Sequence, residues 1–292
     1  MHSLLYYLLY PLLRIISLLP CPILYFISDI LYLALYYVAG YRKKVVYQNL
    51  NNSFPELTGD VIQNIAKEFY HNFCDILLET AKSLSISKNG IMRHCTFAPG
   101  SYGIFEKLYS KNKHVIIVMG HTGNWEYALL SMSARSSYLV QTVYQRLSNK
   151  KFDTLMYHSR SRFGARPIEM RSVTKNMLSP KKKLTTTTFV ADQSSPPEYC
   201  YWTKFLNQDT PVYLGTEKIA VKLNYPVVFA NVKRTKRGFY EIFTELLTEN
   251  AAETSEGEIT TLHTRKLEQA IREQPSNWLW SHRRWKHKRN DS

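Results

Sequence analysis

The stretch that decides the fold is residues 115–126, VIIVMGHTGNWE. Its first five residues form a continuous apolar run, which is typical of a strand buried on both faces of a parallel sheet. Gly120 ends the run, and Trp125–Met132 fits a helix. The polar residues between them therefore follow the carboxyl end of a strand, the position at which open α/β sheets collect their ligands.

The rest of the chain repeats this alternation of strands and helices. Four further strands are expected, at 138–144, 185–191, 226–232 and 239–245. The spacing of apolar residues predicts helices over 61–84, 150–163, 215–223 and 259–272. We therefore expect an α/β fold with a mainly parallel sheet flanked by helices, preceded by an N-terminal membrane helix.

The composition excludes several classes of protein. Of the 292 residues, 45% are hydrophobic, which excludes general disorder. Lys and Arg number 38 against 23 Asp and Glu, and the resulting charge of +15 favours an anionic partner: nucleic acid, anionic lipid, a phosphorylated substrate or an acidic carrier protein. None of the four cysteines forms a Cys-x-x-Cys pair, so neither a zinc site nor a disulfide framework is expected.

The N-terminal 44 residues read as a membrane-anchoring segment, and residues 45–292 as the functional domain. Arg14 and Asp29 are the only charges in the first 41 residues, and the stretch 18–40 has the roughly 20 residues that a bilayer span requires. The basic residues 42–44 follow at once and place the remainder on the cytoplasmic side.

An interfacial helix is the alternative to a span. A carboxylate at mid-membrane, as Asp29 would be, costs about 2.5–3.5 kcal/mol on insertion scales. Residues 4–19 also fit a separate interfacial helix, interrupted at Pro11 and Pro20. A cleaved signal peptide would need a shorter apolar core and a better cleavage site.

The candidate chemistry lies at His121 and Glu126. These residues meet only if His121 lies in the loop after the strand and Glu126 in the first helical turn, with Asn124 as the N-cap. A carboxylate that holds an imidazole fixes its tautomer and prepares it as a general base, and amides at the helix start or at Gly120 and Gly123 suit an oxyanion. The plainer interpretation is a loop histidine and a helix cap. The motifs of zincins, nucleophile elbows, Walker loops and dinucleotide sites are absent from the sequence.

Four motifs together resemble one known family, the bacterial lipid A late acyltransferases (lauroyl/myristoyl transferases) of the glycerolipid acyltransferase superfamily. The His-x4-Glu block at 120–126 is similar to that superfamily's His-x4-Asp/Glu motif. The other three motifs are NLNNSFPE at 49–56, Asp192-Gln193 after a strand, and WLWSHRRWK at 278–286.

This resemblance implies transfer of a fatty acyl chain from a thioester, usually on acyl carrier protein, to a hydroxyl of a lipid A precursor glycolipid at the cytoplasmic face of the bacterial inner membrane. It implies no metal and no cofactor. By resemblance His121 is the general base and Glu126 its partner. Four further residues would shape the donor or acceptor site: Asn124, Arg162, Asp192 and Gln193.

Three departures from the family pattern leave the acceptor open. They are Tyr144-Gln145-Arg146 in place of Tyr-Arg/Lys-Pro, Ser194-Ser195-Pro196 after Asp-Gln, and Phe205-Leu206-Asn207 in place of Phe-Phe-Gly. A lysophospholipid or an amino-acid-linked lipid is thus an alternative acceptor. A non-catalytic binder of anionic lipid or nucleic acid is the alternative of another class.

Two basic stretches carry weaker predictions. Arg160 and Arg162 are candidates for contacts with phosphate groups, or else form a solvated helix end. The Trp-rich basic stretch 276–292 predicts docking on a membrane surface or an acidic carrier through interfacial aromatic residues.

Overall fold

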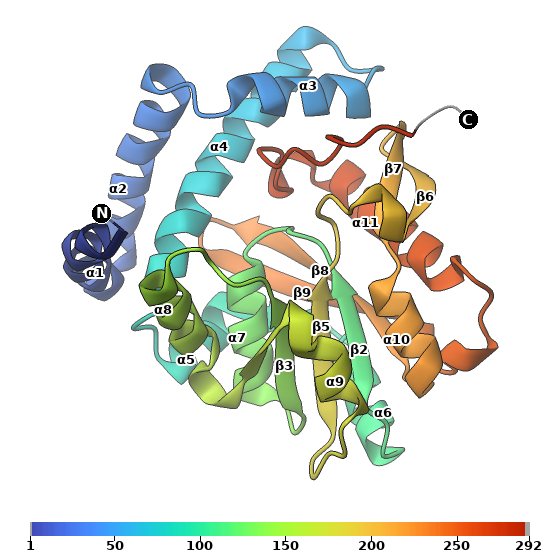
Figure 1. Cartoon of the computed structure of the whole chain (residues 1–292). Coiled ribbons are helices and arrows are strands. Elements are labelled where there is room, and N and C mark those ends of the chain that lie inside the picture. Colours follow the sequence, from blue (N-terminus) through green and yellow to red (C-terminus); the bar gives the residue numbers. More distant parts are fainter. Residues whose placement is uncertain (1, 290–292) are drawn as a thin grey trace.

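A seven-stranded, mostly parallel sheet forms the centre of the protein, with helices on both faces (Figure 1). The computed structural model describes residues 2–289, so residue 1 and residues 290–292, at the outer ends of the two expected domains, lie outside the described range. The strand order is β1-β9-β8-β2-β5-β3-β4, and only β8 and β9 pair antiparallel. These strands are β1 (Cys95–Phe97), β2 (Val115–Met119), β3 (Leu139–Tyr144), β4 (Arg166–Glu169), β5 (Thr185–Val190), β8 (Val227–Lys236) and β9 (Phe239–Thr248).

The α-helices alternate with the strands after an N-terminal helical region. They are α1 (His2–Leu18), α2 (Cys21–Leu33), α3 (Lys43–Ser53), α4 (Gly59–Lys82), α5 (Lys88–His94), α6 (Gly103–Ser110), α7 (Trp125–Arg135), α8 (Lys150–Arg160), α9 (Val173–Leu178), α10 (Gly215–Leu223) and α11 (Glu258–Glu273). A π-helical turn, η1 (Ala34–Val38), extends α2.

The predicted fold class is confirmed, and all five predicted strands are present. The sequence patterns missed four strands, namely β1, β4 and the separate antiparallel hairpin of β6 (Cys200–Phe205) and β7 (Gln208–Tyr213). β1 and β4 lie at the two edges of the sheet and have three and four residues. Strands this short carry too few side chains to show a period.

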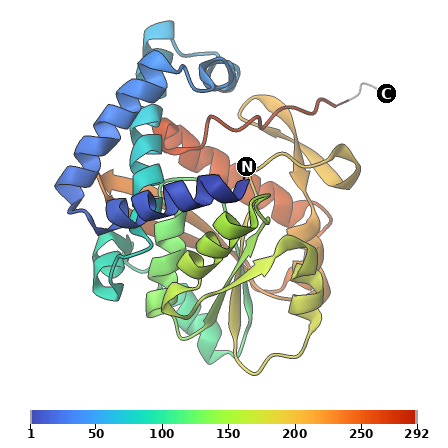
Figure 2. The same cartoon turned by 60° about the vertical axis from the view of Figure 1, so that its left-hand side comes forward.

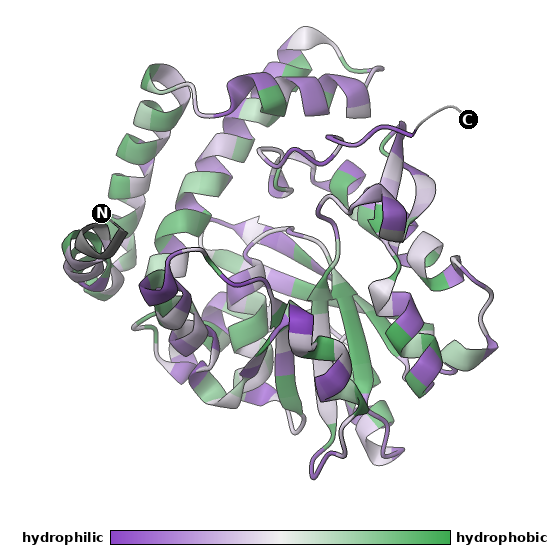
Figure 3. Ribbon diagram, viewed as in Figure 1, coloured by the Kyte–Doolittle hydropathy of each residue, from purple (hydrophilic) through white to green (hydrophobic). Residues whose placement is uncertain are grey.

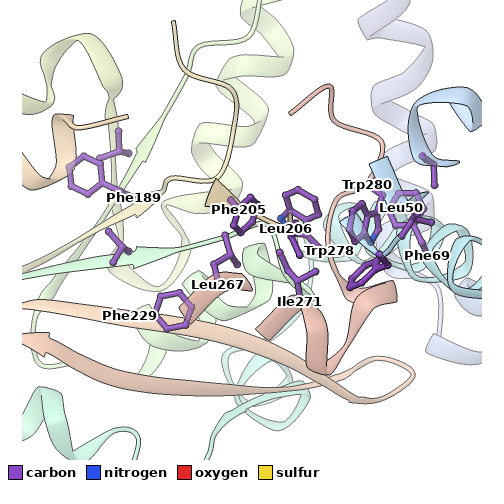
Figure 4. Close-up of a cluster of buried hydrophobic side chains, with 14 of the residues drawn as sticks. Leu50, Phe69, Phe189, Phe205, Leu206, Phe229, Leu267, Ile271, Trp278 and Trp280 are labelled. Carbon is purple, nitrogen blue, oxygen red and sulfur yellow. The ribbon is translucent and has the colours of Figure 1, made fainter. Parts of the chain in front are cut away.

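Strand β2 is buried along its whole length, as its continuous apolar run predicts. Alternate side chains of a strand point to opposite faces. Ile116 and Val118 enter one core cluster, while Ile117 and Met119 enter another. The first cluster joins the sheet to α11 and to the C-terminal segment, and Figure 4 shows its larger side chains, Phe69, Phe205, Leu267, Trp278 and Trp280 among them.

The C-terminal tryptophans pack inside the protein, which corrects the expectation that they anchor at an interface. Trp278 is 2% exposed and Trp280 is 0% exposed. Both belong to the core cluster, and Trp285 packs partly buried against it. Composition alone suggested the interface, whereas burial of large aromatic rings in the core is the more favourable use of their area.

The N-terminal helices lie along one side of the molecule. Both α1 and α2 pack on α4. Pro11 lies inside α1 without ending it, so the expected interruption there is wrong, whereas Pro20 does separate α1 from α2. One helical stretch, Cys21–Val38, is long and apolar enough to cross a membrane by length and composition.

Candidate active site

His121 lies in the tight loop between β2 and α7, where the two glycines are sterically required. A Cβ atom on Gly120 would come within 2.5 Å of the Leu267 side chain. Gly123 has φ +52°, and a Cβ there would lie 2.7 Å from the carbonyl oxygen of Val232. Glycine at these two positions therefore lets the loop pack closely against α11 and β8.

The carboxylate that holds His121 belongs to Asp192. The Nδ1 atom of His121 lies 2.5 Å from Oδ1 of Asp192, and the backbone N–H of His121 donates to Oδ2 over 2.8 Å. β2 and β5 are adjacent parallel strands, with Met119 opposite Val190, so the loops that follow them meet at one edge of the sheet. The sheet register thus creates a His–Asp pair from residues far apart in the chain.

Asp192 is kept ionised in spite of its burial. Removal from water acts to raise the pKa of this carboxyl, but the charge and hydrogen bonds of His121, together with the Trp278 indole, hold the pKa well below its usual range. The indole Nε1 of Trp278 donates to Oδ2 over 2.7 Å. An ionised Asp192 can accept a hydrogen bond from the Nδ1–H group of His121, and this leaves the lone pair of His121 on Nε2.

Glu126 does not pair with His121, which corrects the predicted partnership. Its carboxylate receives a bidentate pair of bonds from Arg160, with Nη2 to Oε1 at 2.5 Å and Nε to Oε2 at 3.0 Å. Within residues 2–289, no hydrogen bond or ion pair joins His121 to Glu126. From the first turn of α7, Glu126 instead meets the end of α8, where the planar fork of Arg160 matches a carboxylate.

Asn124 caps α7 as predicted, but its side chain is buried. Its Oδ1 accepts from the backbone N–H of Tyr127 over 2.8 Å, and its Nδ2 donates to Glu79 over 2.7 Å. Tyr25 and Tyr240 also donate to Glu79, and burial raises the pKa of that carboxyl. From its buried position, Asn124 therefore fixes the conformation of the loop that carries His121.

Arg162 lies in a structural contact, contrary to the expectation that it faces a substrate. Its guanidinium donates to the backbone carbonyls of Ser83 and Ile86, just beyond the end of α4. Such carbonyls at a helix end lack helical partners and commonly bind cationic side chains. Arg160 is likewise occupied, by Glu126, so neither arginine is free to bind a phosphate group of a substrate.

The exposed Gln193 side chain and a small, mostly apolar pocket both adjoin His121. The exposed Gln193 side chain approaches His121, with 3.4 Å between their Nε2 atoms. This small pocket is lined by His121 and Trp125 and by three residues of α4: Phe69, Phe73 and Ile76. An imidazole at the wall of an apolar pocket suits chemistry on a molecule with a hydrocarbon part.

The model of one protein family, described as bacterial lipid A biosynthesis acyltransferase, matches residues 2–287. The chain belongs to this family. It is therefore an acyltransferase of lipid A biosynthesis, an enzyme whose substrates are an acyl donor and a lipid acceptor. No curated protein matches the chain.

The C-terminal segment of this acyltransferase, residues 277–285, forms a strap across the site. The carbonyl of Asn277 accepts from the N–H of Gly123, and Trp278 donates to Asp192. Further along, the ring of His282 accepts from the N–H of Ser194 over 3.2 Å. The strap therefore fixes both loops that carry the His–Asp pair.

The strap also explains why the motif at 49–56 accompanies the one at 278–286. The Nδ2 atom of Asn49 donates to the carbonyls of Trp280 and His282, at 2.8 and 3.0 Å. Phe54 packs against Trp280. Two motifs more than 200 residues apart in the acyltransferase thus form one structural unit, a role that spacing along the chain does not reveal.

Proposed function

We propose that this acyltransferase moves a fatty acyl chain from an acyl carrier protein thioester to a hydroxyl of a lipid A precursor at the cytoplasmic face of the inner membrane. His121 is the general base, and Asp192 orients it. The observation that carries this proposal is the 2.5 Å contact of Nδ1 with a buried, ionised carboxylate, which leaves Nε2, beside the exposed Gln193 side chain, as the basic nitrogen of the ring. A base held in this way is suited to taking a proton from a hydroxyl.

The transfer has two steps, addition of the hydroxyl to the thioester carbonyl and loss of the carrier thiol. Nε2 of His121 takes the proton of the acceptor hydroxyl as that oxygen attacks the thioester carbonyl. The tetrahedral intermediate then loses the carrier thiolate as its C–S bond breaks. The imidazolium returns the proton to the sulfur, and the products are an ester and a free thiol.

The oxyanion is held by the first amides of α7. The N–H groups of His121, Gly123 and Tyr127 already donate to Asp192, Asn277 and Asn124. The Gly123 amide, expected as a donor to the oxyanion, is therefore already occupied. The N–H groups of Trp125 and Glu126, at the positive end of the helix, have no partner within the described chain and remain for the oxyanion.

The remaining predicted site residues support this centre. Gln193 lies at the entrance, where its amide contacts the substrate. Asn124 fixes the start of α7, and Glu126 with Arg160 ties α7 to α8 beside the pocket. Residues 1–44 form the membrane attachment of the enzyme, and residues 45–292 form its catalytic domain.

The test is acyl transfer by membranes that contain the enzyme, with acyl carrier protein thioester as donor and a lipid A precursor as acceptor. We expect a product heavier by one acyl chain in mass spectrometry, and we expect His121→Ala to lower its rate by about 10²–10⁴-fold. Acyl coenzyme A as donor, and a lysophospholipid or an amino-acid-linked lipid as acceptor, serve as parallel reactions. Transfer only to one of those other lipids would contradict the proposed acceptor, and a His121→Ala rate close to wild type would contradict the proposed base.

A further inference from the structure

The N-terminal helices expose an unusually large apolar surface. Of the 21 large hydrophobic residues that are exposed in the described chain, eleven lie between residues 7 and 38. We call this surface the apolar platform: Tyr7, Leu8, Leu12, Ile15, Leu18, Ile23, Phe26, Ile30, Leu33, Tyr37 and Val38. Many exposed apolar side chains gathered on two neighbouring helices mark a contact with a membrane or a protein.

The helices that carry the platform lie on one side of the molecule. In Figure 1, α1 is seen end-on and α2 runs upright beside it. Figure 2 brings this side forward and shows α1 crossing in front of the domain and meeting the foot of α2, which runs up the left-hand edge. The hydropathy colours of Figure 3 show α2 as mostly apolar turns. The two helix axes therefore lie along one surface, neither of them leading away from the domain.

Helix α2 has its polar groups on the inner face. Ser28 donates to Asp75 of α4 over 2.6 Å, and Tyr25 donates to Glu79 over 2.9 Å. The buried stripe along this face is Leu24, Ser28, Tyr32 and Tyr36. The outer face of α2 is apolar, the reverse of a helix on the surface of a soluble domain.

A charged clamp fixes α2 to the catalytic domain. Arg237, in the turn between β8 and β9, contacts Asp29 of α2 at 2.6 Å and Asp75 of α4 at 2.8 Å. Arg234 contacts Asp75 at 2.6 Å as well. Asp29 is thus paired, and α2 cannot leave α4 without breaking the Asp29–Arg237 ion pair and the hydrogen bonds of Ser28 and Tyr25 to α4.

This clamp is incompatible with a helix that crosses the bilayer. If α2 crossed, α4 and the β8–β9 turn would enter the hydrocarbon beside it, with Asp75, Lys236 and Arg237 among their charges. Each charge at the centre of a bilayer costs about 2.5–3.5 kcal/mol on insertion scales.

We propose that α1, α2 and η1 lie flat in one leaflet of the membrane through the apolar platform and that the chain does not cross the bilayer. This inference deepens the membrane attachment in the proposed function and rests on it. Exposed basic residues adjoin the platform, with Arg14 on α1 and Arg42 and Lys44 after η1, and Lys151 of α8 contacts Tyr7. Together with the charge of +15, they suit an anionic lipid surface, whereas pairing of two platforms across a two-fold axis would bring like charges together.

Cysteine labelling separates the two topologies. Cys21 and Cys200, the partly exposed cysteines, are replaced by serine, and Arg14→Cys or Lys44→Cys is introduced. A membrane-impermeant maleimide is applied to intact spheroplasts and to inside-out vesicles. We expect both cysteines to react only in inside-out vesicles. Reaction of Arg14→Cys in intact spheroplasts, or its failure to react from either side, would overturn the flat arrangement.

Flotation with vesicles of phosphatidylcholine and phosphatidylglycerol tests the platform itself. Phe26→Asp/Ile30→Asp is expected to lower the bound fraction at least about tenfold, because two apolar side chains leave the lipid. Leu178→Asp on α9, also an exposed leucine, is the matched control and is expected to bind like wild type. Equal binding by all three proteins, each with the same circular dichroism spectrum, would contradict the proposal. Acyl transfer by wild-type enzyme in detergent tests the proposed function separately, since neither labelling nor flotation depends on activity.

Discussion

Asp192→Asn is expected to lower kcat/KM for acyl transfer by about 10⁴-fold, the largest effect of any single substitution at the site. The amide has nearly the shape of the carboxylate, so the packing against Trp278 is kept. The amide carries no charge to stabilise the imidazolium, and its NH₂ group can donate to Nδ1. Donation to Nδ1 would leave His121 with its proton on Nε2, where it cannot act as a base.

Glu126→Gln is the informative comparison, because sequence spacing pairs His121 with Glu126 whereas the structure pairs it with Asp192. We expect Glu126→Gln to reduce the rate much less, since it disturbs only the contact with Arg160. Asp153→Asn, in the first turn of α8, serves as a control for loss of an acidic charge. Initial rates at saturating donor across a range of acceptor concentrations give the comparison. A larger loss in Glu126→Gln than in Asp192→Asn would return the role of partner to Glu126.

Arg160→Met is expected to destabilise the fold by about 3–5 kcal/mol, because it leaves the buried carboxylate of Glu126 without a partner. The side chain of Glu126 is 7% exposed, so water cannot replace the guanidinium. Urea unfolding followed by circular dichroism measures the change in the free energy of unfolding.

A double variant distinguishes the cost of an unpaired charge from general damage. Arg160→Met/Glu126→Leu removes both partners and is expected to recover most of the stability, since apolar groups of similar size often replace a buried ion pair without loss. Arg272→Met is the matched control: Arg272 pairs with Glu268 on the exposed surface of α11, where loss of a pair costs at most about 1 kcal/mol. Equal stability of Arg160→Met and Arg272→Met would contradict the account of this pair.

The predictable parts of this fold are those with a strong local pattern. The buried run of β2 and the glycine-bracketed loop after it placed His121 correctly, and the residues of that loop sufficed to predict Asn124 as a cap. The short strands β1 and β4 cannot be predicted from the sequence, because each pairs along only one edge and has too few residues to show alternation. Their positions depend on contacts made by the finished sheet.

The pairing of His121 with Asp192 was missed for a related reason. Spacing along a chain reports neighbours within one or two turns, and Asp192 lies 71 residues from His121. The signal that was present is the position of both residues just after apolar strands, since the carboxyl ends of adjacent parallel strands meet. Which strands are adjacent is decided by the order of the whole sheet, so spacing along the chain favours Glu126, the carboxylate nearer in sequence.

The central claim is that His121 and Asp192 act as one unit, and a double-mutant cycle on kcat/KM tests it most directly. His121→Asn, Asp192→Asn and the double variant are compared with wild type in membranes that contain equal amounts of each enzyme. Residues that act together are strongly non-additive, so we expect the double variant to be no slower than the slower single variant. If instead the two losses multiply, His121 and Asp192 act independently and the proposed mechanism is wrong.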